Sequence, residues 1–204
     1  MKKMRRGKRV DLAVNIDRKK DNKQSCKMRL AMAMKKCMKT TSVDNITVKQ
    51  IVKECGLSRQ TFYRHFIDKY DLINWYFDLL LEQSFKEMGD GETIREGLVK
   101  KFTYIREESL FFTMAFKVDQ QNNLKEHDFI MIYEFYCRLI REKTNAIPDE
   151  RVRKILEMYC SSSIYMTVKW VLKGMKESES ELADLMIGAM PREIYDLYVK
   201  LEIL

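Results

Sequence analysis

The chain has 204 residues, 46% of them hydrophobic and 33% charged, with only 7 glycines and 2 prolines. This composition excludes a disordered chain and favours long uninterrupted helices, and the length suffices for one or two domains with a sizeable core. The formal net charge is +8, but residues 1–65 carry a net +14 and residues 66–204 a net −6. The basic N-terminal third therefore suits a polyanion such as DNA, whereas the acidic remainder must interact with something else.

The side chains that catalysis or metal binding would need lack the usual spacings. None of the five cysteines forms a C-x-x-C pair, and the two histidines, His65 and His127, lie far apart. Gly56 stands alone rather than in a phosphate-binding loop, and no apolar run approaches the ~20 residues that span a bilayer. We therefore expect a cytoplasmic protein with reduced thiols, no metal, no cofactor, no membrane contact and no enzymatic activity.

Residues 1–20 form a basic segment, with six Lys or Arg residues among the first ten. This segment is either a flexible arm that reaches DNA phosphates or the minor groove, or a frayed tail. An apolar stripe at helical spacing then predicts a helix over residues 22–39. The members of this stripe are Leu30, Ala33, Met34, Cys37 and Met38.

The most informative stretch runs from Ile46 to Lys69 and predicts two short helices joined by a tight turn. Thr47 and Gln50 have the spacing of a capping box at the start of the first helix. Gly56 follows that helix, where a left-handed backbone conformation is needed, and Ser58 can cap the second helix. Two short helices with a glycine turn, the second one polar and basic, are typical of a helix-turn-helix that enters the major groove.

The second helix of this motif supplies the predicted contacts to base edges. Arg59 can pair with guanine, Gln60 can pair with adenine, and the methyl group of Thr61 can touch thymine. Neighbouring polar and basic side chains are placed to hold phosphates. The predicted DNA contacts are Thr47, Ser58, Arg59, Gln60, Thr61, Tyr63, Arg64, His65 and Lys69.

The rest of the chain is predicted to be helical throughout. Asp68 can cap the next helix, with Ile67 and Leu72 as its hydrophobic staple, and this helix is expected to reach about Met88. A short turn at 89–92 follows. Further helices are predicted over residues 93–106, 108–118, 124–145, 148–175, 178–190 and 192–203. The sequence thus predicts an all-α protein.

The stretch from Ile46 to Leu72 resembles the DNA-binding motif of the tetracycline-repressor (TetR) family of bacterial regulators. The matching features are ITV-x-x-I at 46–51, GLS at 56–58, Thr61-Phe62-Tyr63, His65-Phe66, and Asp68-Lys69 followed by Leu72. Apart from Gln60, the predicted DNA contacts also match the family pattern. Gln60 departs from it, because a small residue is common at that position, so the resemblance does not transfer a family operator sequence.

The resemblance implies a transcriptional regulator with three regions: a basic arm (1–20), a three-helix helix-turn-helix domain (21–67), and a larger helical effector and dimerisation domain (68–204). It also implies a homodimer on a palindromic operator, formed through the helices near 148–175 and 178–190. Dimerisation is expected physically as well, because one reading helix covers too few base pairs for useful specificity.

Three C-terminal segments bear a looser resemblance to regulators of dihydroxyacetone-kinase operons, which act with a partner protein. These segments are FFTMAFKVDQQNN at 111–123, KWVLKGM at 169–175 and ESELADLM at 179–186. The resemblance therefore implies a small-molecule effector or a co-regulator protein as a further partner.

Aromatic residues after the motif are the candidates for lining a small-molecule effector site, which TetR relatives often have between these helices. They are Trp75, Tyr76, Phe102, Phe111, Phe112, Tyr133 and Tyr136. An aromatic stripe at helical spacing is, however, more often part of a packed core. The alternative function is a basic helical module that binds nucleic acid or a partner protein without sensing a small ligand.

Overall fold

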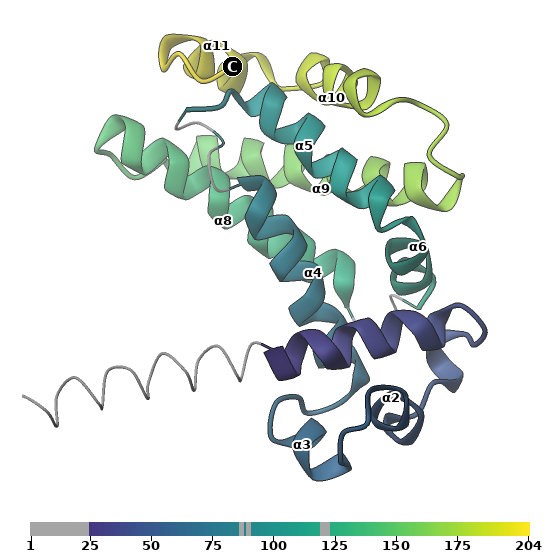
Figure 1. The fold of residues 1–204 in the computed structure, drawn as a ribbon. Coiled ribbons are helices and arrows are strands. Elements are labelled where there is room, and N and C mark those ends of the chain that lie inside the picture. Colours follow the sequence, from purple (N-terminus) through teal and green to yellow (C-terminus); the bar gives the residue numbers. More distant parts are fainter. Residues whose placement is uncertain (1–24, 86–87, 89–90, 119–122) are drawn as a thin grey trace, which may run out of the picture. The chain divides into compact units, whose positions relative to one another are not determined.

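The computed structural model describes residues 25–85, 88, 91–118 and 123–204, so the predicted basic arm at 1–20 lies outside the described residues. Every regular element within those ranges is a helix, which confirms the all-α prediction. The chain divides into two compact units, Met1–Leu72 and Ile73–Leu204, whose helices are drawn in Figure 1.

The described part of the first unit contains three α-helices and one short 3-10 helix. They are a helix over residues 25–38, η1 (Val43–Asn45), α2 (Val48–Cys55) and α3 (Arg59–Tyr63). The apolar stripe predicted for the first helix lies in the core, except that Cys37 is half-buried. Ile51 of α2 and Phe62 of α3 are fully buried as well, so all three helices share one apolar core.

Helix α4 (Lys69–Phe85) begins with a cap from Asp68, as predicted. Asp68 Oδ1 accepts from the N–H groups two and three positions later, at 2.8 and 2.9 Å, and Asp71 Oδ2 accepts from the N–H of Ile67 at 2.9 Å. The predicted staple is wrong: Leu72 is buried, but Ile67 is 83% exposed. The two carboxylates therefore fix the start of this helix without an apolar contact from Ile67.

Helix α4 continues into the second unit, and six further helices follow in the described residues. They are α5 (Ile94–Glu107), α6 (Ser109–Lys117), α8 (Leu124–Thr144), α9 (Glu150–Leu172), α10 (Glu179–Gly188) and α11 (Arg192–Lys200). Helix α10 packs along α5, as Figure 1 shows, while α9 contacts α8, α6 and α11. The second unit is therefore a helical bundle with α9 in contact with three neighbours.

Two arginines of α5 attach it to α10 and to the turn before that helix. Arg95 donates to both carboxylate oxygens of Asp184, at 2.7 and 3.1 Å. Arg106 donates to the backbone carbonyls of Met175 at 3.0 Å and Glu177 at 2.7 Å. The planar guanidinium groups thus hold both ends of the α5–α10 pair.

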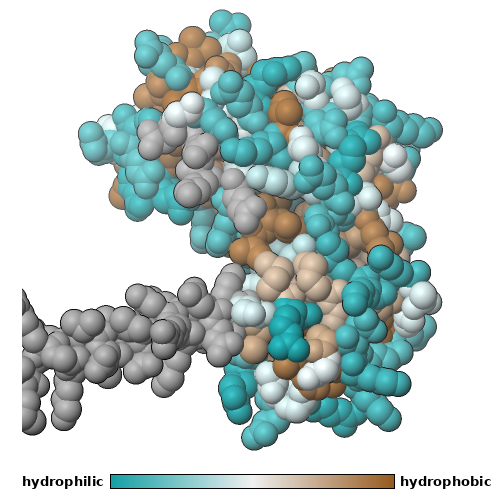
Figure 2. Space-filling model, in the orientation of Figure 1, coloured by the Kyte–Doolittle hydropathy of each residue, from teal (hydrophilic) through white to brown (hydrophobic). Residues whose placement is uncertain are grey.

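Figure 2 shows one face of the molecule, on which hydrophilic residues cover most of the described surface and hydrophobic residues reach it in separate patches. Exposed large apolar side chains include Met158, Tyr165 and Leu172 of α9 and Leu185 of α10. No helix among the described residues is both long and apolar enough to cross a bilayer.

Candidate DNA interface

Helix α2 and the turn that follows it have the predicted geometry. Thr47 Oγ1 accepts from the N–H of Gln50 at 3.3 Å, and Gln50 Oε1 accepts from the N–H of Thr47 at 2.7 Å, so the capping box is complete. Gly56 adopts φ 65°, a left-handed conformation that side chains disfavour. The N–H of Leu57 then donates to the carbonyl of Val52 at 2.9 Å and closes the helix end. This closed turn sets the direction in which α3 starts.

Helix α3 is five residues long and has one inner and one outer face. Ser58 caps it by accepting the N–H of Thr61 at 3.0 Å. Phe62 is completely buried, and its ring centroid lies 5.8 Å from that of Phe66. Since Phe62 anchors the inner face, the outer face presents four exposed polar side chains. These are Arg59, Gln60, Tyr63 and Arg64.

The hydroxyl groups of Thr47 and Ser58, two of the predicted phosphate contacts, are engaged in the helix caps. Thr47 Oγ1 donates to Gln50 Oε1 at 2.8 Å, and Ser58 Oγ lies 2.9 Å from Thr61 Oγ1. A phosphate contact by Thr47 would have to replace its bond to Gln50. His65 is half-buried, and its ring centroid lies 6.5 Å from that of Phe66. Among the predicted contacts, the exposed side chains that take no part in a helix cap are therefore Arg59, Gln60, Tyr63 and Arg64.

Lys69 occupies a different place from the one predicted. Its ammonium donates to three backbone carbonyls, those of Val43 at 2.7 Å, Asp44 at 2.6 Å and Ile46 at 3.0 Å. An ammonium has three N–H donors, so these bonds use all of them. Burial lowers the pKa of Lys69, while the nearby carboxylates of Asp44 and Asp68 act in the opposite direction. This arrangement speaks against the predicted phosphate contact, because no donor remains for a phosphate oxygen.

Two basic residues of the first helix also hold the motif, and the sequence analysis did not assign them this role. Arg29 Nη2 donates to the carbonyl of Cys55 at 2.7 Å, at the C-terminal end of α2. The ammonium of Lys27 lies 5.1 Å from the ring centroid of Phe66. These partners are separated by 26 or more positions in the chain. No local spacing pattern reveals such pairs, although helix C-terminal carbonyls generally attract basic groups.

The seven candidate effector-site residues lie in different surroundings rather than around one cavity. Phe102 and Tyr136 line a cavity of about 20 Å³, which is room for about one water molecule. Tyr133 lines a separate groove with Arg138 and Arg153. Trp75 is half-buried.

Tyr76, Phe111 and Phe112 are buried and packed on other rings. Tyr76 and Phe111 meet edge to face with centroids 4.9 Å apart, and Phe112 meets Phe77 at 5.7 Å. These distances are those of aromatic pairs in packed protein cores. The structure therefore does not support the predicted effector site at these seven residues.

The geometry of the first unit defines a class of protein. A short helix with a buried inner face and a polar, basic outer face, set by a glycine turn, is the DNA-binding element of a helix-turn-helix protein. Residues 33–75 match the model of bacterial regulatory proteins of the tetR family, and residues 92–191 match the model of a transcriptional regulator C-terminal region. The chain belongs to the tetR family and is a DNA-binding transcriptional regulator rather than an enzyme.

Comparison with individual proteins agrees with this family. The chain is 26% identical over 105 residues to the HTH-type dhaKLM operon transcriptional activator DhaS of Lactococcus lactis subsp. lactis (strain IL1403). That match covers 52% of this chain and 54% of DhaS, so the chain spans about half the length of this curated relative. This match agrees with the looser resemblance to regulators of dihydroxyacetone-kinase operons.

Solved structures show the same fold. The dihydroxyacetone kinase operon activator DhaS matches with a TM-score of 0.60 at 19% identity, over 87% of this chain and 96% of that one. The TetR family repressor AlkX from Dietzia sp. strain DQ12-45-1b, implicated in biodegradation of n-alkanes, matches with a TM-score of 0.50 at 17% identity. The AlkX match covers 85% of this chain and 95% of AlkX.

Proposed function

We propose that α3 reads base edges in the major groove and that the protein acts in the cytoplasm on a palindromic operator as a homodimer. The observation that carries this proposal is the division of α3 into a buried Phe62 and an exposed outer face. On that face Arg59 and Gln60 bring bidentate groups suited to guanine and adenine. Tyr63, which is 59% exposed, and Arg64 are suited to adjacent phosphates.

The remaining predicted contacts have different roles in this proposal. Thr61 offers its methyl group, while Thr47, Ser58 and His65 border the backbone of the DNA. Lys69 is not a phosphate contact but a positioning residue, because its three donors hold the loop before α2.

We further propose that two copies associate through the outward faces of α9 and α10. Met158 and Met166 of α9 are 74% and 40% exposed, and Leu185 of α10 is 58% exposed. Apolar side chains of this size favour burial against another surface. A two-fold arrangement places two reading helices on half-sites about one helical turn of DNA apart, which multiplies specificity.

The dimer proposal is tested by mass measurement of the purified protein. Met158→Lys together with Leu185→Lys is expected to shift the dimer to a monomer at micromolar concentration. Ile130→Lys on α8 is the matched control, because Ile130 is 46% exposed and lies outside the proposed face. An unchanged dimer in the double variant would assign association to another surface.

A signal is proposed to reach the reading helices through the second unit. The dimer has two conformations that differ in the spacing of the two reading helices. An effector or a co-regulator protein shifts the population toward the conformation that it binds more tightly. DhaS is named as the activator of an operon, and its similarity supports operon regulation by this chain. The alternative, a basic helical module without ligand sensing, predicts operator affinity that responds to no added compound.

Selection of bound fragments from a random duplex pool tests the whole proposal. The expected outcome is enrichment of a short palindrome with half-sites about 10 base pairs apart. Recovery of duplexes with no shared sequence, or equally tight binding to single-stranded RNA, would support the basic-module alternative. The genes beside genomic copies of the enriched sequence then identify the regulated operon.

A further inference from the structure

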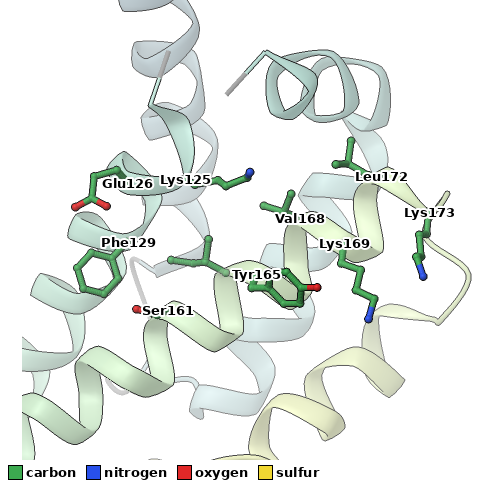
Figure 3. Close-up of a pocket in the computed structure, with 10 residues that line it drawn as sticks. Lys125, Glu126, Phe129, Ser161, Tyr165, Val168, Lys169, Leu172 and Lys173 are labelled. Atoms are coloured by element: carbon green, nitrogen blue, oxygen red, sulfur yellow. The ribbon is translucent and has the colours of Figure 1, made fainter. Parts of the chain in front are cut away.

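A groove of about 500 Å³ lies between α8 and α9, and Figure 3 shows Tyr165, Lys169 and Leu172 among the residues that line it. All three are exposed and lie on the outward face of α9 that also carries Met158 and Met166. The proposed dimer covers this face, so the groove belongs to the interface between copies. The first unit, in contrast, has an apolar side chain to which neither the dimer nor the proposed DNA contacts give a role.

This side chain is Ile67, which at 83% exposure is the most exposed large apolar side chain among the described residues. Single apolar side chains are common on protein surfaces, so exposure alone gives Ile67 no role. Its position in the motif is more informative, because it follows α3 between the buried Phe66 and Asp68, which caps α4. Neither the core of the first unit nor the start of α4 uses this side chain.

Helical hydrogen bonding continues beyond α3 and places Ile67 on the outer face of that helix. The N–H of Phe66 donates to the carbonyl of Phe62 at 2.9 Å, as in an α-helix. Ile67 follows Gln60 by seven positions and Tyr63 by four, the spacing at which residues share one helix face. The buried Phe62 is five positions before Ile67, about 140° away around a helix. Ile67 therefore extends the outer face that carries Gln60 and Tyr63.

The backbone around Ile67 is fixed in the protein without DNA. The N–H of Ile67 donates to Asp71 Oδ2 at 2.9 Å, and the preceding Phe66 is buried in the core. A β-branched side chain has few χ1 rotamers, so isoleucine on a fixed backbone loses little conformational entropy when another surface covers it. Ile67 is thus a preorganised apolar group that the described chain leaves in solvent.

In the proposed complex, Ile67 is expected at the wall of the major groove. The N-terminal residues of the reading helix in a helix-turn-helix contact base edges. Ile67 lies seven residues after Gln60, about 10 Å further along the helix, and therefore beyond the bases that Gln60 reaches. The groove wall consists of phosphates and deoxyribose, and isoleucine has no donor for a phosphate oxygen. Deoxyribose carbons are thus the apolar surface that matches Ile67.

We propose that Ile67 packs against deoxyribose carbons of one DNA strand at each half-site and adds affinity that does not depend on salt. The contact rests on the proposed function, in which α3 enters the major groove. Burial of apolar surface releases no counterions, whereas phosphate contacts by Lys or Arg do. Because deoxyribose occurs at every nucleotide, the contact strengthens binding to operator and random duplexes by the same factor.

Anisotropy titrations of the full-length protein with operator and random duplexes at several salt concentrations measure this contribution. Ile67→Ala removes three carbon atoms, and if DNA covers half of their surface, both complexes weaken about five- to tenfold. The slope of log Kd against log salt is expected to stay unchanged. Ile67→Val removes one carbon atom and is expected to weaken binding only about twofold. Ile147→Ala in the second unit is the matched control, because Ile147 is 75% exposed, and it is expected to change neither quantity.

Ile67→Lys tests the position of this side chain independently of the apolar contact. An ammonium group at the groove wall meets a phosphate, so the salt slope is expected to become steeper by about one unit for each bound subunit. Urea denaturation of Ile67→Ala is expected to give the parent midpoint, because the side chain is exposed. A lowered midpoint would assign the weaker binding to the fold and overturn the proposal.

The remaining outcomes separate this contact from its alternatives. Parent-like affinity of Ile67→Ala, or a parent-like salt slope of Ile67→Lys, would place Ile67 away from the groove wall and overturn the proposal. A loss confined to the operator would assign Ile67 to a base instead of a sugar, which also overturns it. A parent protein that selects no palindrome would refute the proposed operator, whereas the Ile67 measurements on random duplexes would keep their meaning. The two failures are therefore distinguishable.

Discussion

Substitution of Lys69 by methionine tests how the motif is held. The change shortens the unbranched side chain by only one atom but removes the three hydrogen bonds to Val43, Asp44 and Ile46. A hydrogen bond from a charged group contributes about 1.5–3 kcal/mol. The carbonyl of Asp44 is exposed and water replaces its bond, which leaves two partly buried bonds. Desolvation of the ammonium offsets part of their contribution, so we expect a loss of about 2–3 kcal/mol in unfolding free energy.

The assay is urea denaturation of the full-length protein, followed by titration of operator and random duplexes at several salt concentrations. Lys69→Met is expected to lower the denaturation midpoint and to weaken all duplexes while leaving the salt slope unchanged. Lys49→Met is the stability control, because Lys49 is an exposed lysine of α2 and should change stability by less than about 0.5 kcal/mol. An unchanged midpoint with a salt slope lower by about one unit would instead make Lys69 a phosphate contact.

Three further predictions concern the reading helix and the charges of the second unit. Arg59→Ala should weaken binding to the operator by about 1–3 kcal/mol and relax the base preference. An equal loss of affinity for random DNA in a gel-shift series would show that Arg59 does not read a base. The hydrogen bond that His127 donates to the carboxylate of Asp78 raises the pKa of His127 from its ordinary value of 6.5. The stabilisation from this pair is therefore fully present below pH 6.5 and declines as the pH rises through the raised pKa. His127→Gln should flatten this part of the urea-midpoint profile, and an unaltered profile would contradict the assignment. The ammonium of Lys101 lies 3.7 Å from the buried carboxylate of Asp128, and Lys101→Met removes this partner. The substitution should lower the unfolding free energy by about 3–5 kcal/mol. Calorimetry should show that adding Asp128→Leu to the same protein restores most of this loss.

The sequence predicted those features whose causes are local. The caps at Thr47 and Ser58 and the left-handed Gly56 depend on residues three positions apart or on one backbone angle, and all three are present. Helix bounds follow for the same reason: the helix predicted over 124–145 spans Leu124–Thr144. The helix predicted over 148–175 starts later, at Glu150, because Asp149 supplies the cap by accepting the N–H of Val152.

Features that depend on distant parts of the chain could not be predicted in this way. The bonds of Lys69 reach back 23 to 26 positions, and that of Arg29 reaches forward 26, so no spacing pattern marks them. Ile67 had the right spacing for a staple, but the direction of the chain turns it into solvent. Aromatic spacing alone also could not distinguish a cavity from the packed rings around Phe111.

Methylation protection on the selected operator shows whether α3 enters the major groove, since dimethyl sulfate attacks guanine N7 there. We expect protected guanines in two half-sites about 10 base pairs apart, and loss of these protections with the Arg59→Ala protein at saturating concentration. Full occupancy with every guanine N7 still reactive would show that α3 does not enter the major groove.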